Sequence, residues 1–336
     1  IQNEFQTNKQ KSQPTPSTTM RIITKQQMKQ VYQMSQAVQD TEKAFVAYTN
    51  KESQTPLRVN IPTTHGSTLF MPAAVNDACG VKIVAVRPQN AQLKLPTVPA
   101  VYIDIDEKTG FSSSMIDGQL LTYFRTGAAS GVAVRHLAKQ NCECLLIIGA
   151  GFQGTAGAEA ALTQRKFSRI IAIDAFQPSL DKFQQFIHEL NGQTVETHLM
   201  DRVNEFVPMA DVIITTTTSN TPVFDGHLVK EGCLVCGVGS YQPTCRELDS
   251  HLIHKSRIVV DTRAGALAEA GDLVIPISEK ILSTDLVEEI GELPKRKDEK
   301  EIIVFKTVGS AVQDVVVGHE ICRRCEEAGL GQVVEM

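Results

Sequence analysis

Three positively charged side chains in the first part of the chain stand alone among apolar or small residues. Arg58 follows a Pro-Leu pair, Lys82 interrupts a run of strand-forming residues, and Arg125 follows the largely apolar segment Leu120–Phe124. A guanidinium has a fork of N–H donors that matches the two oxygens of a carboxylate. Together the three cations predict a site for a small carboxylate, whereas any one of them alone is more typical of a solvated charge.

A glycine-rich segment later in the chain indicates a second kind of chemistry. It reads Gly149-Ala150-Gly151-Phe152-Gln153-Gly154, directly after a predicted strand at Cys144–Ile148 and at the start of a predicted helix. In this pattern the first glycine permits a tight turn, the second lets the backbone approach a pyrophosphate, and the third lets helix and strand pack closely. The pyrophosphate lies at the helix N-terminus, where free N–H groups favour anions. The segment predicts a dinucleotide site.

The end of the next predicted strand bears on which dinucleotide is bound. Asp174 follows Arg169–Ile173, near the position where a carboxylate binds the ribose diol and would repel a 2′-phosphate. No cation follows it in the next three residues, so we expect NAD(H) in preference to NADP(H). Thr216 and Thr217 end another strand, where their hydroxyls would line the cofactor cleft. A solvated turn for Asp174 and exposed threonines are the alternatives.

The elements that must position these residues fall into two groups. The length of 336 residues suggests two domains. From Met20 to about Gly110 the pattern predicts a helix followed by short strands and a hairpin turn, an α+β unit. From Cys144 onward, apolar runs alternate with helical segments, which predicts a parallel sheet covered on both faces. The fold class is therefore α/β, a Rossmann domain plus an α+β domain.

Two helices connect these groups. A long helix is predicted from Met115 to Ala138, and its small residues Gly127–Gly131 allow close approach of either a neighbouring element or a ligand. A last helix, Ala311–Ala328, is expected to pack back onto the first unit. Residues 1–19 are rich in Gln, Thr, Ser and Pro and are expected to form a disordered tail or tag.

Composition excludes several classes of protein. The formal net charge of −5 lacks the basic excess of a nucleic-acid binder, and no apolar run approaches the roughly 18 residues of a membrane span. The eight cysteines are sparse, which favours a reducing, cytoplasmic location. The pairs Cys233/Cys236 and Cys322/Cys325 are interpreted as buried thiols, and no metal site is expected.

Several segments resemble the ornithine cyclodeaminase/mu-crystallin family, in family order from about Met20 to the C-terminus. The segments that resemble it are Leu69-Phe70-Met71-Pro72, Gly80-Val81-Lys82, Arg125-Thr126-Gly127-Ala128-Ala129-Ser130, Gly149-Ala150-Gly151-Phe152-Gln153, Gly237-Val238-Gly239-Ser240 and Val304-Phe305-Lys306-Thr307-Val308-Gly309. The resemblance implies a homodimer. It also implies a substrate and dimerisation domain at 20–124 with 305–336, around a Rossmann domain at 125–304.

The resemblance also assigns site residues. Arg58, Lys82 and Arg125 match positions that hold the substrate carboxylate, and Thr97 matches a residue near the nicotinamide. The expected cofactor-binding set is Thr97, Arg125, Thr126, Ser130, Gly149, Gly151, Phe152, Gln153, Gly154, Asp174, Thr216, Thr217, Gly239 and Val308. Lys82, crowded by two arginines, is a candidate proton donor.

Two departures from the family pattern favour one activity over another. Ornithine cyclodeaminases have an acid where this chain has Leu69 and a catalytic Asp where it has Tyr241. Without these acids, loss of ammonia from a diamino acid lacks a general base. We therefore expect NAD(P)H-dependent reduction of a cyclic imine carboxylate, Δ1-pyrroline-2-carboxylate to L-proline. The alternatives are ornithine cyclodeaminase, an open-chain amino-acid dehydrogenase and a non-catalytic ligand-binding protein.

Overall fold

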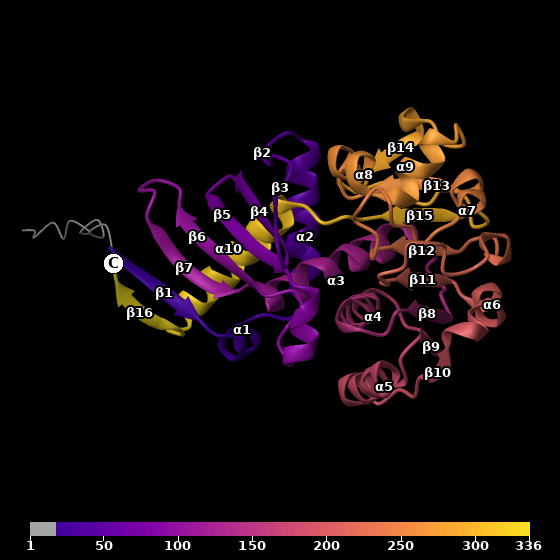
Figure 1. Ribbon diagram of the computed structural model, residues 1–336, viewed down its shortest axis with the longest axis horizontal. Helices are drawn as coiled ribbons and strands as arrows, with labels where there is room; N and C mark the ends of the chain where they lie inside the picture. The colour runs from indigo at the N-terminus through magenta and orange to yellow at the C-terminus, as the bar shows by residue number, and fades with distance from the viewer. Residues whose placement is uncertain (1–17) are drawn as a thin grey trace, which may run out of the picture.

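The computed structural model describes residues 18–336, which fold around two sheets (Figure 1). The first sheet has the strand order β16-β1-β7-β6-β5-β4-β2, with β3 paired to β4. All its pairs are antiparallel except β1 with β7. Its strands are β1 (Thr19–Ile23), β2 (Ser53–Gln54), β3 (Val59–Thr63), β4 (Gly66–Val75), β5 (Ala78–Val86), β6 (Ala100–Asp106), β7 (Ser112–Asp117) and β16 (Gln332–Glu335).

The second sheet is parallel throughout, in the order β10-β9-β8-β11-β12-β15-β13-β14. The order reverses between β8 and β11, which is the topological switch of a Rossmann fold. The predicted α/β class is therefore confirmed. Its strands are β8 (Cys144–Ile148), β9 (Arg169–Asp174), β10 (Glu196–Leu199), β11 (Val212–Thr215), β12 (Leu234–Gly237), β13 (Arg257–Val260), β14 (Val287–Glu289) and β15 (Ile303–Lys306).

Helices cover both faces of the second sheet and one face of the first. In the second sheet, successive residues of β8 point to opposite faces, and both faces are apolar. Leu145 and Ile147 join the core under α3 and α4, whereas Leu146 and Ile148 join the core on the other face. The helices are α1 (Lys25–Val31), α2 (Met34–Thr49), α3 (Gly118–Leu137), α4 (Phe152–Gln164), α5 (Gln177–Asn191), α6 (Val203–Phe206), α7 (Ser250–Lys255), α8 (Arg263–Glu269), α9 (Gly271–Ser278) and α10 (Ala311–Glu327). Within the described residues, none of them has both the length and the apolar character needed to cross a bilayer.

Helix α3 connects the two sheets and starts later than the sequence predicts. Residues Met115 and Ile116 belong to β7, and the helix begins at Gly118 because the Asp117 side chain accepts a hydrogen bond from Leu120 N at 2.7 Å. The small residues of α3 serve helix packing, since a Cβ on Gly127 would lie 2.5 Å from the Ala156 carbonyl oxygen of α4. Of the two roles that the sequence left open for Gly127–Gly131, the structure therefore supports close approach of a neighbouring element.

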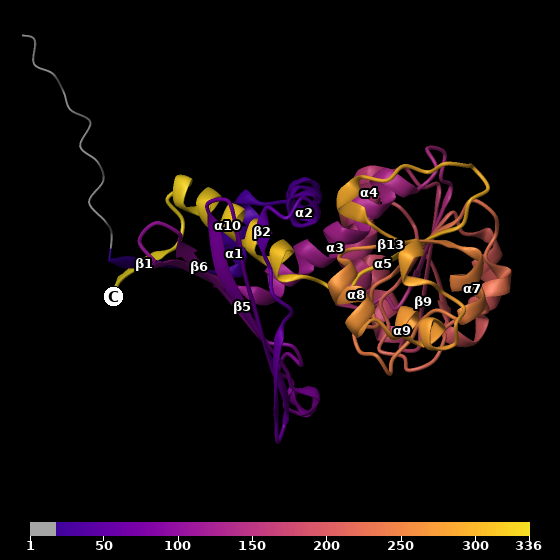
Figure 2. The ribbon, with the colours of Figure 1, turned by 90° about the horizontal axis from the view of Figure 1, so that it is seen from above.

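The C-terminal part of the chain returns to the first sheet, as expected (Figures 1 and 2). Helix α10 packs on β4, β5 and α2. The strand β16 then pairs with β1 from Thr19 onward, so the expected tail reaches one residue too far; its residues 1–17 lie outside the described part. The predicted domain boundary at 304/305 falls inside a strand, because β15 extends to Lys306 and pairs within the second sheet over its whole length. Both differences arise from pairing with strands distant in sequence.

Candidate functional site

A cavity of about 520 Å³ lies between the two sheets and collects most of the predicted site residues. From the side of the first sheet come Arg58, from the segment before β3, and Lys82, from β5. The predicted residues that line it are Arg58, Lys82, Thr97, Arg125, Thr126, Gln153, Thr216, Thr217, Gly239 and Val308. Its size is that of a small-molecule site.

The parallel sheet explains why distant segments meet on one wall of this cavity. Thr216 follows β11, Gly239 follows β12, and Val308 follows β15, so all three stand beyond the carboxyl ends of neighbouring parallel strands. Ligands of open α/β sheets bind at this edge, beside the switch point. The order of the strands therefore determines which loops form the wall.

The glycine turn next to this wall has the geometry that a dinucleotide needs. Gly149 has a φ of +94°, and a Cβ on Gly154 would lie 2.0 Å from the Gly149 carbonyl oxygen. These two glycines permit the turn and the close packing of α4. At Gly151 a Cβ would meet no protein atom within 4 Å, so its face is free for an approaching pyrophosphate. The turn therefore fits a dinucleotide.

Three other predicted cofactor residues lie outside the cavity. Asp174 is at the glycine turn, where its Oδ2 accepts a hydrogen bond from Ala150 N at 2.7 Å. Phe152 is exposed, with its ring centroid 5.0 Å from that of Tyr123. Ser130 is buried between α3 and α4, near Gly157. The structure does not bring Ser130 or Phe152 to the cavity.

The three predicted cations lie close together on the cavity wall. Lys82 Nζ is 2.7 Å from Asp314 Oδ1, and Arg125 Nε is 3.1 Å from the same oxygen. Lys82 has only 1% of its side chain exposed. Burial, followed by the charge of Arg125, lowers the pKa of Lys82 to about 7, while Asp314 acts in the opposite direction. Crowding by arginines was therefore only part of the cause.

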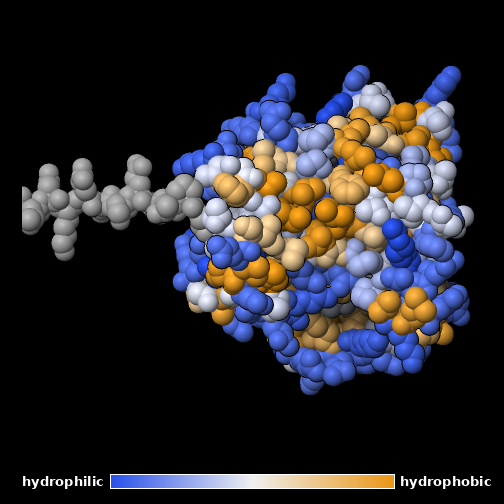
Figure 3. Space-filling model, turned by 60° about the vertical axis from the view of Figure 1, so that its left-hand side comes forward, coloured by the Kyte–Doolittle hydropathy of each residue, from blue (hydrophilic) through white to orange (hydrophobic). Residues whose placement is uncertain are grey.

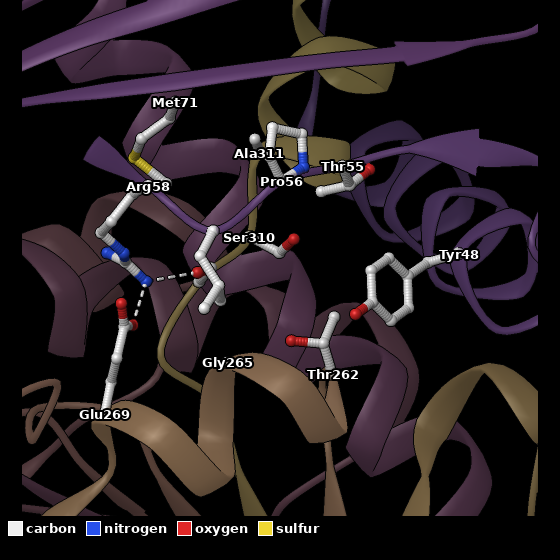
Figure 4. A pocket seen from close by; sticks show the side chains of 12 residues that line it. Tyr48, Thr55, Pro56, Arg58, Met71, Thr262, Gly265, Glu269, Ser310 and Ala311 are labelled. Atoms are coloured by element: carbon white, nitrogen blue, oxygen red, sulfur yellow. Dashed lines mark hydrogen bonds and ion pairs between the residues drawn. The ribbon is translucent and has the colours of Figure 1, made fainter.

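Arg58 is held by the loop between β15 and α10. Its Nη2 donates to the carbonyl oxygens of Val308 at 2.9 Å and Gly309 at 2.7 Å. Figure 4 shows this guanidinium also facing Glu269, whose carboxylate lies 2.8 Å away. Burial raises the pKa of Glu269. The carboxylate site formed by the three cations therefore already contains one carboxylate of the protein, that of Glu269, beside Arg58.

The buried side chain of Asp261 fixes the conformation of the loop between β15 and α10. Asp261 Oδ2 accepts hydrogen bonds from Thr307 Oγ1 at 2.6 Å and from the backbone N–H groups of Val308 and Gly309, both at 2.9 Å. Burial raises the pKa of Asp261, whereas these donors lower it. A fixed loop places its carbonyl groups, and through them Arg58, at the cavity edge.

A second buried carboxylate joins two loops of the cofactor-side wall. Glu247 accepts hydrogen bonds from Thr217 N at 2.6 Å and Thr217 Oγ1 at 2.8 Å on one loop, and from Gly239 N at 2.7 Å on the other. Its backbone N–H donates to Asp272 Oδ1 at 2.6 Å. Asp272 in turn pairs with Lys306 at 2.8 Å. These charges brace the wall without lining the cavity.

Sequence reasoning missed the acids around the cations. Asp314, Glu269 and Asp261 stand in segments that read as ordinary helix or strand ends. The sequence offered one sign of a buried acid, a single carboxylate among apolar residues, as in the segment around Asp314. Whether that side of the helix is buried depends on tertiary packing, which the sequence does not show. The two departures from the family pattern were informative, since Leu69 and Tyr241 both line the cavity.

Comparison with known proteins agrees with this geometry. The family model described as ornithine cyclodeaminase/mu-crystallin family matches residues 18–329. A Delta(1)-pyrroline-2-carboxylate reductase of Bacillus thuringiensis subsp. konkukian is 33% identical over 327 residues, covering 94% of this chain and 100% of the relative.

Two solved structures have the same fold over nearly their whole length. The Delta(1)-pyrroline-2-carboxylate reductase of Thermococcus litoralis, in complex with NADH and L-proline, has a TM-score of 0.89 and 31% identity, covering 93% of this chain and 99% of that one. An archaeal alanine dehydrogenase dimer with bound NAD has a TM-score of 0.88 and 29% identity, covering 95% and 99%. All these similarities extend over both sheets.

Proposed function

The chain belongs to the ornithine cyclodeaminase/mu-crystallin family, and on that premise we propose that it is an NADH-dependent reductase of a small cyclic imine carboxylate. The preferred substrate is Δ1-pyrroline-2-carboxylate, which gives L-proline, and the six-membered analogue is a second substrate. The observation that supports the proposal most strongly is the cavity itself. It brings Arg58, Lys82 and Arg125 together with the loops that follow the parallel strands.

The three cations bind the carboxylate of the imine. Arg58 and Arg125 each offer N–H donors of a guanidinium fork, and Lys82 adds a point charge. Holding the ring in one orientation supplies several kcal/mol of barrier reduction because the reacting atoms no longer have to find each other. A nicotinamide held by the loops after the parallel strands would supply the hydride.

Lys82 supplies the proton that the imine nitrogen needs. A protonated iminium accepts a hydride more readily than a neutral imine. A general acid is most effective when its pKa lies near the working pH, and burial lowers the pKa of Lys82 to about 7. Its ammonium stands on the cavity wall, so the proton passes directly to the substrate side.

The remaining wall favours reduction of an imine over removal of ammonia from ornithine. Leu69 and Tyr241 line the cavity at the two positions where cyclodeaminases of the family are expected to have acids. A second amino group would lie against these side chains without a carboxylate to bind it or accept its proton. A small apolar ring fits the same surface.

The preference for NADH over NADPH rests on Asp174. Its Oδ2 accepts a hydrogen bond from Ala150 N of the glycine turn, and its Oδ1 accepts one from Phe176 N. A 2′-phosphate placed there would meet this negative charge. The next residues, Ala175 and Phe176, bring no cation to offset it.

The protein forms a homodimer through the open face of its first sheet. Val81 and Ile83 of β5 and Val101 and Ile103 of β6 point away from α2 and α10, and they remain only half-buried. Figure 3, viewed from the side of this sheet, shows apolar side chains gathered on the surface. Apolar patches of this kind mark protein interfaces. The first sheet with α10 is thus the substrate and dimerisation domain.

The proposed location is the cytoplasm, where cysteines remain thiols.

Measuring the oxidation of NADH in the presence of Δ1-pyrroline-2-carboxylate tests the proposal. We expect rapid turnover with the imine, slower turnover with NADPH, and little ammonia from ornithine with NAD⁺. Pyruvate with ammonia is the control for an open-chain dehydrogenase. Ammonia release from ornithine at a rate comparable to imine reduction would contradict the proposal.

A further inference from the structure

A buried aspartate that does not line the cavity lies directly behind two of its cations. Asp314 is in the first turn of α10 and is fully buried. Its Oδ1 is 2.7 Å from Lys82 Nζ and 3.1 Å from Arg125 Nε. Among the described residues, Oδ2 has no hydrogen-bond partner. One carboxylate therefore serves two cations that come from different elements.

The fold holds this carboxylate in place. Helix α10 runs from Ala311 to Glu327, and its N-terminal end, capped by Ser310, carries partial positive charge that favours an anion in the first turn. Gln313 next to it donates to the Arg125 carbonyl oxygen at 3.3 Å, which ties α10 to α3. The position of Asp314 relative to Arg125 is thus fixed from both helices.

The charges around Lys82 determine what the aspartate does. Arg125 of α3 and Arg58 of the segment before β3 both repel the ammonium, and burial opposes its charge. Opposite Lys82 on β6 stands Tyr102, whose hydroxyl donates to Asp104 Oδ1 at 2.9 Å and whose pKa is raised by burial. Beyond the arginines, Asp261 faces Arg125 and Glu269 faces Arg58. Within the part of the chain that the structure describes, Asp314 is the anion in direct contact with Lys82.

We propose that Asp314 is a positioning residue that keeps Lys82 protonated and aimed at the cavity until the imine takes the proton. The inference rests on the proposed function, and it assigns to Asp314 no contact with the substrate. A carboxylate that is shared with Arg125 holds the ammonium less firmly than an exclusive pair would. Lys82 therefore retains its proton in the free enzyme and still releases it during the reaction.

Two measurements on Asp314→Asn test the inference. The first is the pH dependence of kcat/KM for imine reduction, which in the wild type is expected to fall as the pH rises past about 7. The variant should lose activity at a pH about one unit lower or more, because an opposite charge at this distance shifts a pKa by about 1–3 units. The second measurement is the ¹³Cε titration of Lys82 by NMR, assigned with Lys82→Arg, which does not require activity.

Control variants separate this role from a structural one. Asp211→Asn removes a buried carboxylate that pairs with Lys139 and Lys230 and does not line the cavity, so it should leave both titrations unchanged. Asp314→Ser removes the same charge with less volume and replaces Asp314→Asn where that variant does not fold. A Lys82 titration that is unchanged in either Asp314 variant overturns the inference. Wild-type protein that does not reduce the imine overturns the proposed function, while the NMR titration still tests Asp314.

Discussion

Among the described residues, two lysine–aspartate pairs have both side chains almost completely buried, and the distances within them are nearly the same. Lys82 and Asp314 are 2.7 Å apart with exposures of 1% and 0%, and Lys306 and Asp272 are 2.8 Å apart with both at 0%. The first pair joins β5 to α10 at the cavity, whereas the second joins β15 to α9 inside the Rossmann domain. Distance and burial alone do not distinguish them.

The neighbours of each carboxylate show the difference. Asp272 accepts hydrogen bonds from the backbone N–H groups of Glu247 and Leu248 at 2.6 and 2.9 Å, so it supports a loop. Asp314 instead shares one oxygen between Lys82 and Arg125. One pair fixes the backbone, and the other leaves excess positive charge at a cavity. A buried pair becomes useful for chemistry when its cation borders a cavity and its anion is shared.

Removing each lysine should have the largest and most contrasting effects. We expect Lys82→Met to lower kcat/KM for the imine by about 10³-fold or more, since it removes a carboxylate ligand and the proton donor together. Lys306→Met leaves Asp272 buried without its partner and should cost about 3–5 kcal/mol of unfolding free energy. Steady-state kinetics and urea unfolding of both variants measure the contrast. Comparable losses of activity per folded molecule would remove the distinction between the pairs.

The Rossmann pair also leads to a prediction about cofactor binding. Because Glu247 joins the loops at Thr217 and Gly239, Glu247→Gln places an amide N–H₂ against N–H donors. We expect KM for NADH to rise about tenfold or more, with a smaller change for the imine, as hydrogen bonds to a charged group contribute about 1.5–3 kcal/mol. Glu205→Gln, on an exposed salt bridge to Arg202, is the matched control. An equal rise in both KM values would instead indicate general loosening.

Patterns local in sequence predicted the fold of the Rossmann domain well. The glycine turn between β8 and α4 was predicted from residues that are neighbours in the chain, and its geometry depends on Gly149 and Gly154 themselves. The parallel strands also followed from short apolar runs. Such features are determined by backbone conformation and by burial of single segments, which the sequence shows directly.

The ion pairs behind the cations could not be predicted in this way. Asp314 is 232 residues from Lys82 along the chain, and Glu269 is on a helix of the other domain from Arg58. Nothing in the local sequence indicates that these acids are buried, because their surroundings are created by packing of α10 and α8. The same holds for β16, which is a strand only because β1 lies beside it.

A smaller effect on the KM for the imine is expected from Glu269, the protein carboxylate that lies beside Arg58. Glu269 is 2.8 Å from Arg58, so its negative charge opposes that of an incoming carboxylate. We expect Glu269→Gln to lower KM for the imine about three- to tenfold, with little change in KM for NADH. Glu279→Gln, outside the cavity, is the control. An increase in KM for the imine would show that Glu269 serves mainly to orient Arg58.

The smallest effect concerns a partly exposed pair, which should respond to pH without affecting catalysis. His319 Nδ1 is 3.1 Å from Asp104 Oδ1, and this hydrogen bond raises the pKa of His319 above its usual range. A raised pKa in the folded state means that the contribution to stability is complete below the unfolded value of about 6.5 and is lost as the pH rises through the folded value. His319→Gln should therefore lower the unfolding free energy in mildly acidic buffer, by less than about 1 kcal/mol, and have less effect at alkaline pH. Urea unfolding at both pH values, with the exposed His65→Gln as control, measures this difference, and a larger loss at alkaline pH would contradict it.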